Sequence, residues 1–173
     1  MDTKLFLLLN NLTSHSVWFD RLIYFCAEIL PWVVVIVLVV FILAKKSWPE
    51  FFKMLLIFFS AGTVWFLTGF FKYLYLSPRP FVLLNNIKPL FVNGGLESMP
   101  SGHAIFMASL AGASVLFKDR RIAVVLSVGA IIIAVARVVA GVHWPSDVVV
   151  GLTIGFVFGL LVQRLWQKIF FRQ

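Results

Sequence analysis

The chain has 173 residues, of which 61% are hydrophobic and 13% charged, and its formal net charge is +8. A soluble domain of this length needs more polar residues to cover its surface, so the composition indicates an integral membrane protein. The basic residues cluster at the ends of apolar segments instead of forming a stripe with interleaved aromatic residues, so no nucleic acid partner is expected.

One domain over residues 1–173 is expected, because no linker or low-complexity tract divides the chain. The single cysteine, Cys26, lies in an apolar run. One cysteine excludes both a disulfide framework and a thiolate metal cluster.

The N-terminal segment predicts a short helix over residues 2–12. At about 1.5 Å per residue this helix spans roughly 16 Å, which is too short to cross a bilayer. Asp2 precedes the first lysine and the apolar run has only five residues, unlike a cleaved signal peptide. We therefore expect a helix at the membrane interface, with its Leu and Phe side chains in the headgroup boundary.

Five apolar segments are predicted to cross the membrane as helices, since a span takes about 20 apolar residues. They cover residues 21–44, 51–76, 102–117, 121–142 and 147–167. The third is short, which suits a helix that begins inside the bundle. The predicted fold is thus an all-α bundle of about five transmembrane helices plus the N-terminal interfacial helix.

The connections between these spans differ in character. Residues 45–50 and 118–121 form short basic connections, whereas 77–101 is a long loop rich in Pro and Gly and 137–147 holds the last turn. Nine of the fifteen basic residues lie in or beside the two short connections and at the C-terminus: Lys45, Lys46, Lys53, Lys118, Arg120, Arg121, Arg164, Lys168 and Arg172. The positive-inside rule places them in the cytoplasm and the loops 77–101 and 137–147 outside.

Three basic residues, Lys72, Arg79 and Arg137, stand at span ends on the outer face, where this rule disfavours them. Lys72 and Arg79 are seven residues apart and could share a helix face, although Pro78 disturbs the last turn. They could be cations that extend to the interface. Convergence from separate segments favours a shared anionic partner such as a phosphate, which Arg binds with paired donors.

The sequence PSGH at residues 100–103 precedes the third span. Ser101 and Gly102 can cap this helix, and its first backbone N–H groups then form an anion site. His103 follows in the first turn. The alternative is a capping serine beside an incidental polar residue.

His143 and Asp147 are four residues apart at the start of the fifth span. Asp147 can accept a proton from one ring nitrogen and leave the other lone pair free, as a general base or a nucleophile requires. Alternatively, Asp147 caps the helix and His143 lies at the interface. His15 lies in a polar segment and is expected to be solvated.

Three motifs resemble the signature of the type 2 phosphatidic acid phosphatase superfamily. They are KYLYLSPRP at residues 72–80, PSGH at 100–103 and ARVVAGVHWPSD at 136–147. The spacing of the signature residues fits throughout. The one departure is Ala136, where the pattern often has Ser, which removes a hydroxyl contact and no catalytic charge. The resemblance covers about residues 51–160.

The resemblance implies a role for each motif residue. His143 attacks phosphorus and forms a phosphohistidine, Asp147 orients His143, and His103 protonates the leaving oxygen and then activates water. The groups implied to bind the phosphate oxygens are Lys72, Arg79, Ser101, Gly102 and Arg137. No metal or other cofactor is implied.

The expected function is therefore that of a metal-independent membrane lipid phosphatase, with its site on the outer face of a bacterial inner membrane. Small bacterial members of the family act on undecaprenyl diphosphate, phosphatidylglycerophosphate or lipid A 1-phosphate. Two alternatives remain: a lipid phosphotransferase and a non-catalytic lipid-binding protein.

Two acidic residues outside the motifs also call for a role. Glu28 lies within the first span, where a charge marks a functional site or pairs internally, here with Arg21 seven residues earlier. Glu97 precedes the PSGH motif, and it either tunes His103 or is solvated. Solvation is the expectation.

Overall fold

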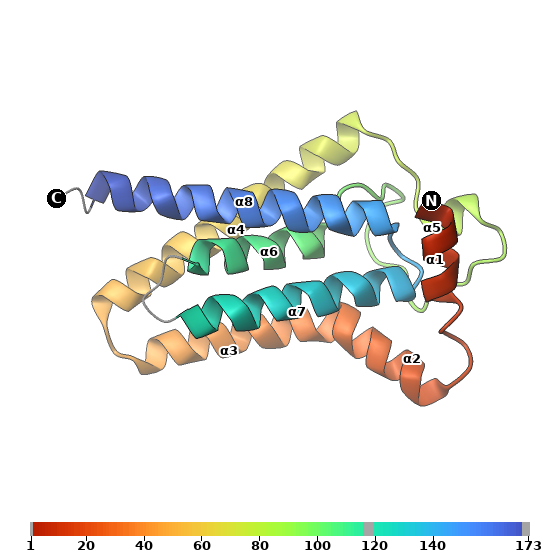
Figure 1. The fold of residues 1–173 in the computed structure, drawn as a ribbon, viewed down its shortest axis with the longest axis horizontal. Helices are drawn as coiled ribbons and strands as arrows, with labels where there is room; N and C mark the ends of the chain where they lie inside the picture. Colours follow the sequence, from red (N-terminus) through yellow and green to blue (C-terminus); the bar gives the residue numbers. More distant parts are fainter. Residues whose placement is uncertain (1, 116–119, 171–173) are drawn as a thin grey trace.

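The bundle is built from helices that run along one long axis (Figure 1). The structure, a computed structural model, describes residues 2–115 and 120–170, and every regular element within them is helical. The elements are α1 (Asp2–Asn10), α2 (Val17–Tyr24), η1 (Phe25–Ile29), α3 (Leu30–Ala44), α4 (Trp48–Leu74), α5 (Pro80–Leu83), α6 (Gly102–Ser114), α7 (Arg120–Val139) and α8 (Pro145–Phe170).

Four helical segments are long and apolar enough to cross a membrane: Val17–Ala44, Trp48–Leu74, Arg120–Val139 and Pro145–Ile169. They correspond to four of the five predicted spans. The predicted third span is α6, whose 13 residues cover about 20 Å, less than the roughly 30 Å of a bilayer core. Its predicted last residues, 116 and 117, and most of the connection 118–121 lie outside the described residues.

Helix α6 is the centre of the bundle, because it packs against α4, α7 and α8 and nearly all of its residues are buried. Small residues allow α8 to approach it closely. A Cβ atom built on Gly155 would clash with the carbonyl oxygen of Ile105, and one on Gly159 with that of Ser109. Such small-residue contacts are how membrane helices gain van der Waals packing.

The first span, Val17–Ala44, is one helix in which the π-helical turn η1 separates the α-helical segments α2 and α3. Pro31, in the first turn of α3, has no N–H. In a regular α-helix the residue at this position would donate to the carbonyl of Ala27, four residues earlier. The sequence therefore leaves the Ala27 carbonyl available to another donor.

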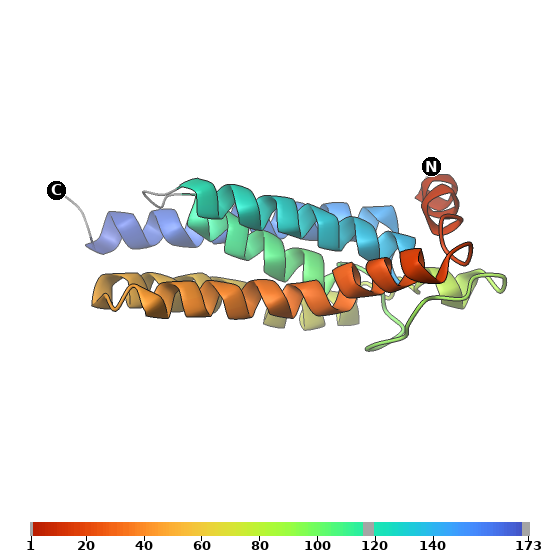
Figure 2. The ribbon, with the colours of Figure 1, turned by 90° about the horizontal axis from the view of Figure 1, so that it is seen from below.

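Helix α1 lies crosswise over one end of the bundle (Figure 1 and Figure 2). The predicted short helix is confirmed, but the expected place of Phe6 in the headgroup boundary is wrong. Phe6 is fully buried and packs on Trp144, with ring centroids 5.1 Å apart. Asn10 Nδ2 donates to the Val139 carbonyl at 2.9 Å, so α1 is bound to the end of α7.

The other end of the bundle holds the turn between α3 and α4, the start of α7 and the end of α8 (Figure 1). The basic residues predicted to be cytoplasmic lie at or near these helix ends, except Lys118 and Arg172, which lie outside the described residues. The two loops predicted to be outside lie at the opposite end with α1. The basic residues predicted to be cytoplasmic and the two loops predicted to be outside thus lie at opposite ends of the fold.

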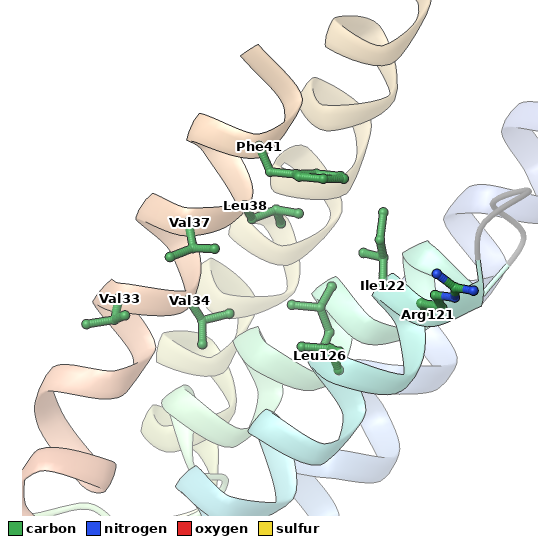
Figure 3. A pocket seen from close by; sticks show the side chains of 9 residues that line it. Val33, Val34, Val37, Leu38, Phe41, Arg121, Ile122 and Leu126 are labelled. Atoms are coloured by element: carbon green, nitrogen blue, oxygen red, sulfur yellow. The ribbon is translucent and has the colours of Figure 1, made fainter. Parts of the chain in front are cut away.

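A groove of about 380 Å³ runs between α3 and α7 (Figure 3). Its lining is apolar apart from Arg121 and includes Val37, Phe41 and Leu126. None of the predicted site residues lines it.

Candidate active site

The three sequence motifs meet at the end of the bundle that α1 covers. The first motif joins the end of α4 to α5, the second begins α6, and the third joins α7 to α8. The second and third motifs are linked by a backbone hydrogen bond of 3.2 Å from the Ser101 amide to the Asp147 carbonyl. The first and third are linked by a bond from Trp144 Nε1 to the Pro78 carbonyl at 3.0 Å.

His143 and Asp147 form a buried pair at the start of α8, with Nδ1 3.3 Å from Oδ2. The same carboxylate oxygen accepts a bond from the Trp144 amide at 2.7 Å and another from the Ser98 hydroxyl. With its proton on Nδ1, His143 donates to Asp147 and keeps an unprotonated Nε2.

Burial lowers the pKa of His143 well below its usual value, and the nearby cations Arg137, Arg79 and Lys72 lower it further. A neutral imidazole has the free lone pair that a nucleophile needs. The cations therefore favour the reactive form of the ring while they make the surroundings attractive to an anion.

His103 lies in the first turn of α6, half-buried and close enough to His143 for electrostatic interaction. Within residues 2–115 and 120–170 no hydrogen bond to its ring occurs. Its neighbour Gly102 packs against Trp65, where an added Cβ would lie a tight 3.3 Å from the indole Nε1. Glycine thus lets α4 approach the beginning of α6.

Lys72 and Arg79 both donate to the backbone carbonyl of Glu97. The distance to this oxygen is 3.1 Å from Lys72 Nζ and 3.4 Å from Arg79 Nε. Glu97 contributes this carbonyl, and its side chain is partly exposed. Arg79 is only 3% exposed. The long loop therefore holds two of the three predicted phosphate-binding cations through one backbone group.

Three donors at this end of the bundle are buried without a hydrogen-bond partner among the described residues: a terminal nitrogen of Arg79, the Ser101 hydroxyl and Arg137 Nε. Ser101 occupies the N-cap position of α6, but its side chain makes no capping bond. Buried polar groups are nearly always paired in folded proteins. A bound anion with several oxygens could pair with all three.

Arg137 is held from the first span. One of its terminal nitrogens donates to Glu28 Oε1 at 2.9 Å and to the Ala27 carbonyl at 3.1 Å. The expected Arg21–Glu28 pair is therefore wrong, and Arg21 lies instead over the ring of Trp18. Glu28 lies within the π-helical turn η1, which changes the helical phase after α2, so the seven-residue spacing no longer places the two residues on one face.

Sequence reasoning missed three contributors to this region. The Ser98 hydroxyl donates to the Asp147 carboxylate, Asn93 donates to Glu28, and Asp2 accepts hydrogen bonds from the backbone amide and hydroxyl of Ser146. Each lies outside the three motifs. The position of Ser98, two residues before the PSGH motif, was the only local signal.

The described part of the chain contains no group of three or more His, Cys, Asp or Glu residues that could hold a metal ion. Among the described residues, the charged groups at the site include the three cations and the Asp147 carboxylate, with Glu28 bound to Arg137 and Glu97 near Lys72 and Arg79.

Known proteins share this arrangement of sequence and fold. The YbjG protein of Escherichia coli strain K12, named "Putative undecaprenyl-diphosphatase", is 30% identical over 168 residues, which cover 96% of this chain and 83% of YbjG. A lipid A 1-phosphatase of Rhizobium etli is 39% identical over 81 residues, 46% of this chain and 34% of that protein.

Among solved structures, Aquifex aeolicus LpxE superposes with a TM-score of 0.71 at 27% identity and covers 94% of both chains. The family model described as PAP2 superfamily matches residues 52–171, well over half of the sequence. These residues include all three motifs. The chain therefore belongs to the PAP2 superfamily.

Proposed function

We propose that this membrane protein, a lipid phosphatase by its family and relatives, cleaves phosphate from a lipid phosphomonoester or diphosphate through a phosphohistidine on His143. The observation that carries the proposal is the buried His143–Asp147 pair beside three cations, two of which, Arg79 and Arg137, have a buried donor without a partner among the described residues. The imidazole supplies the nucleophile, and the donors supply the charge stabilisation that phosphoryl transfer requires.

The first step forms a bond between His143 Nε2 and phosphorus while the bond from phosphorus to the lipid oxygen breaks. His103 gives its proton to the departing oxygen. Asp147 accepts a hydrogen bond from Nδ1–H of His143 and stabilises the positive charge that develops on the ring. Lys72, Arg79, Arg137, the Ser101 hydroxyl and the Gly102 amide bind the other phosphate oxygens.

The second step releases phosphate. His103, now neutral, takes a proton from water, the water oxygen bonds to phosphorus, and the bond from phosphorus to His143 breaks. Both histidines return to their starting states, and the net reaction consumes one water. The side-chain cations balance the negative charge of the phosphate oxygens in both steps, so the proposed reaction needs no metal.

The substrate class follows from the relatives and from the position of the site. The names of two relatives specify undecaprenyl diphosphate and the 1-phosphate of lipid A. Phosphatidylglycerophosphate has the same terminal phosphate and is the third candidate. The site lies at an end of the bundle, where a lipid headgroup resides while the acyl chains stay in the bilayer. By the charge rule this end faces the outside of the cytoplasmic membrane.

The test is phosphate release by the purified protein in detergent from each of these three lipids, with His143→Ala as the control. Release without any acceptor lipid and in the presence of EDTA supports a metal-independent hydrolase. Transfer to an added acceptor lipid without release indicates the phosphotransferase. The absence of both reactions on all three lipids contradicts the proposal.

A further inference from the structure

Glu28 is a charged residue within a membrane-crossing segment, and the three motifs do not include it. Its side chain is 14% exposed and that of its partner Arg137 only 2%. A carboxylate within a membrane-crossing segment is costly and is retained where it has a partner and a function. Glu28 has two partners, one for each oxygen.

The first oxygen of Glu28 binds a terminal nitrogen of Arg137 at 2.9 Å, and the Ala27 carbonyl binds the same nitrogen at 3.1 Å. That carbonyl is available because Pro31 cannot donate to it. The π-helical turn η1 places both acceptors toward Arg137. π-Helical turns within α-helices are frequent at functional sites.

The second oxygen of Glu28 accepts a bond from Asn93 Nδ2 at 2.9 Å. Two residues earlier, the ring of Phe91 lies 5.5 Å from the guanidinium carbon of Arg137 and packs edge-on against Tyr24. The first span therefore contacts both Arg137 and the loop residues Phe91 and Asn93, through Glu28 and Tyr24.

The same loop continues to the other two cations. Gly94 has φ 83°, and a Cβ there would come within 3.4 Å of an Arg79 terminal nitrogen. Glu97 then accepts bonds from Arg79 and Lys72 through its carbonyl. Residues 91–97 thus run from the Glu28–Arg137 pair to the remaining phosphate-binding groups.

We propose that Glu28 is a positioning residue of the reaction. It holds one terminal nitrogen of Arg137, so that Nε, which is buried without a partner, is directed to the phosphate. It also anchors the loop that holds Arg79 and Lys72. This inference rests on the proposed function and adds the first span, which carries no motif, to the machinery that orients the substrate.

A simpler role for Glu28 is to offset the charge of three clustered cations. The two roles predict opposite effects on an anion that resembles the transition state. If Glu28 only offsets charge, its removal raises the positive potential and strengthens the binding of orthovanadate. If Glu28 positions Arg137, its removal weakens that binding.

The experiment compares Glu28→Gln and Glu28→Ala with the wild type in detergent, measuring kcat, KM for the lipid and the inhibition constant of orthovanadate. We expect Glu28→Ala to lower kcat about 10-fold to 100-fold and to weaken vanadate inhibition by a similar factor, with a smaller change in KM. Glu28→Gln keeps an acceptor for Arg137, so its losses are smaller.

The control is Glu50→Gln, which removes a carboxylate paired with Lys53 and Lys45 at the other end of the bundle and leaves kcat unchanged. A structural role would reduce only the fraction of active protein, which lowers kcat but leaves the vanadate constant unchanged. That result, or stronger vanadate inhibition, overturns the proposal. If Glu28→Ala does not fold, Glu28→Gln decides between the same outcomes. An inactive wild type refutes the proposed function instead.

Discussion

A single carboxylate oxygen of Asp147 contacts both the His143 ring and the backbone amide of Trp144, the residue that follows His143. This oxygen, Oδ2, lies 3.3 Å from His143 Nδ1 and 2.7 Å from the Trp144 amide. The backbone bond fixes the carboxylate relative to the chain on which the imidazole is mounted. The ring therefore has a defined orientation before a substrate binds, which reduces the reorganisation needed for attack.

Asp147→Asn is expected to lower kcat by about 10²-fold or more, because the amide can present its NH₂ group to Nδ1 and favour the wrong tautomer. Ser98→Ala removes one hydrogen bond to the same carboxylate but leaves the acceptor for Nδ1 in place, so it is expected to lower kcat less than Asp147→Asn does. The expected loss is about tenfold, because a hydrogen bond to a charged group contributes about 1.5 kcal/mol or more. The measurement is steady-state phosphate release, with thermal unfolding as the folding control. Equal losses in the two variants would contradict the role of Asp147.

The roles of the two histidines can be separated with p-nitrophenyl phosphate, whose leaving group needs no proton. His103→Ala is expected to lose about 10²-fold to 10⁴-fold in turnover of the lipid, as loss of a general acid–base group does. On the aryl phosphate it should still give a burst of nitrophenol equal to the enzyme concentration, because His143 is phosphorylated and water attack is then slow. His143→Ala should give no burst. A burst from His143→Ala would exclude it as the nucleophile.

The fold was predictable where long apolar runs and charge asymmetry determine it. The all-helical membrane bundle, four spans and the superfamily are confirmed. The role of α6 was less accessible, because a short apolar segment in the centre of a bundle has the same composition as one that crosses the membrane. The burial of Phe6 was also missed, since its partner Trp144 is far away in the sequence.

At the site, spacing identified the residues that share a motif and failed for those that a helix irregularity brings together. The Arg21–Glu28 pair rested on regular α-helical phase, which the turn η1 breaks. The true partner, Arg137, is more than a hundred residues away. The roles assigned to the motif residues stay predictions, and the experiments above address them.

Stability should fall in acid because of His143. The folded state holds the pKa of this ring well below its usual value, whereas the unfolded chain takes up a proton near pH 6.5. The contribution of the neutral ring to the free energy of unfolding is therefore fully present above that pH. Below it, each further pH unit lowers the free energy of unfolding by up to about 1.4 kcal/mol for this one group. The midpoint of thermal unfolding in detergent, measured from pH 7.5 to 5.0, should fall less in His143→Gln than in the wild type. Parallel curves would show that the ring is charged in the folded protein.

The topology can be tested with a reporter that is active only in the cytoplasm. Fused after Gln173 it should be active, because the end of α8 lies with most of the basic residues. Inserted after Asn86, in the exposed loop at the opposite end, it should be inactive. Activity at Asn86 and none at Gln173 would invert the orientation and place the site in the cytoplasm.

The contact between α6 and α8 should be intolerant of even one added carbon. Gly155→Ala forces a Cβ against the Ile105 carbonyl, and this backbone group cannot move aside without shifting the helix that carries His103. Overpacking of this kind costs about 1–3 kcal/mol. The matched control is Gly129→Ala in α7, where no atom lies within 4 Å of the added Cβ and helix propensity favours alanine by up to about 1 kcal/mol. Thermal unfolding in detergent should therefore show a lower midpoint for Gly155→Ala and an unchanged or higher one for Gly129→Ala.

The same contact should affect activity. Because the displaced Ile105 backbone belongs to the first turn of α6, which also contains His103, Gly155→Ala should lose phosphatase activity at temperatures where it remains folded. A Gly155→Ala variant with normal stability and activity would show that α6 and α8 are not in this close contact.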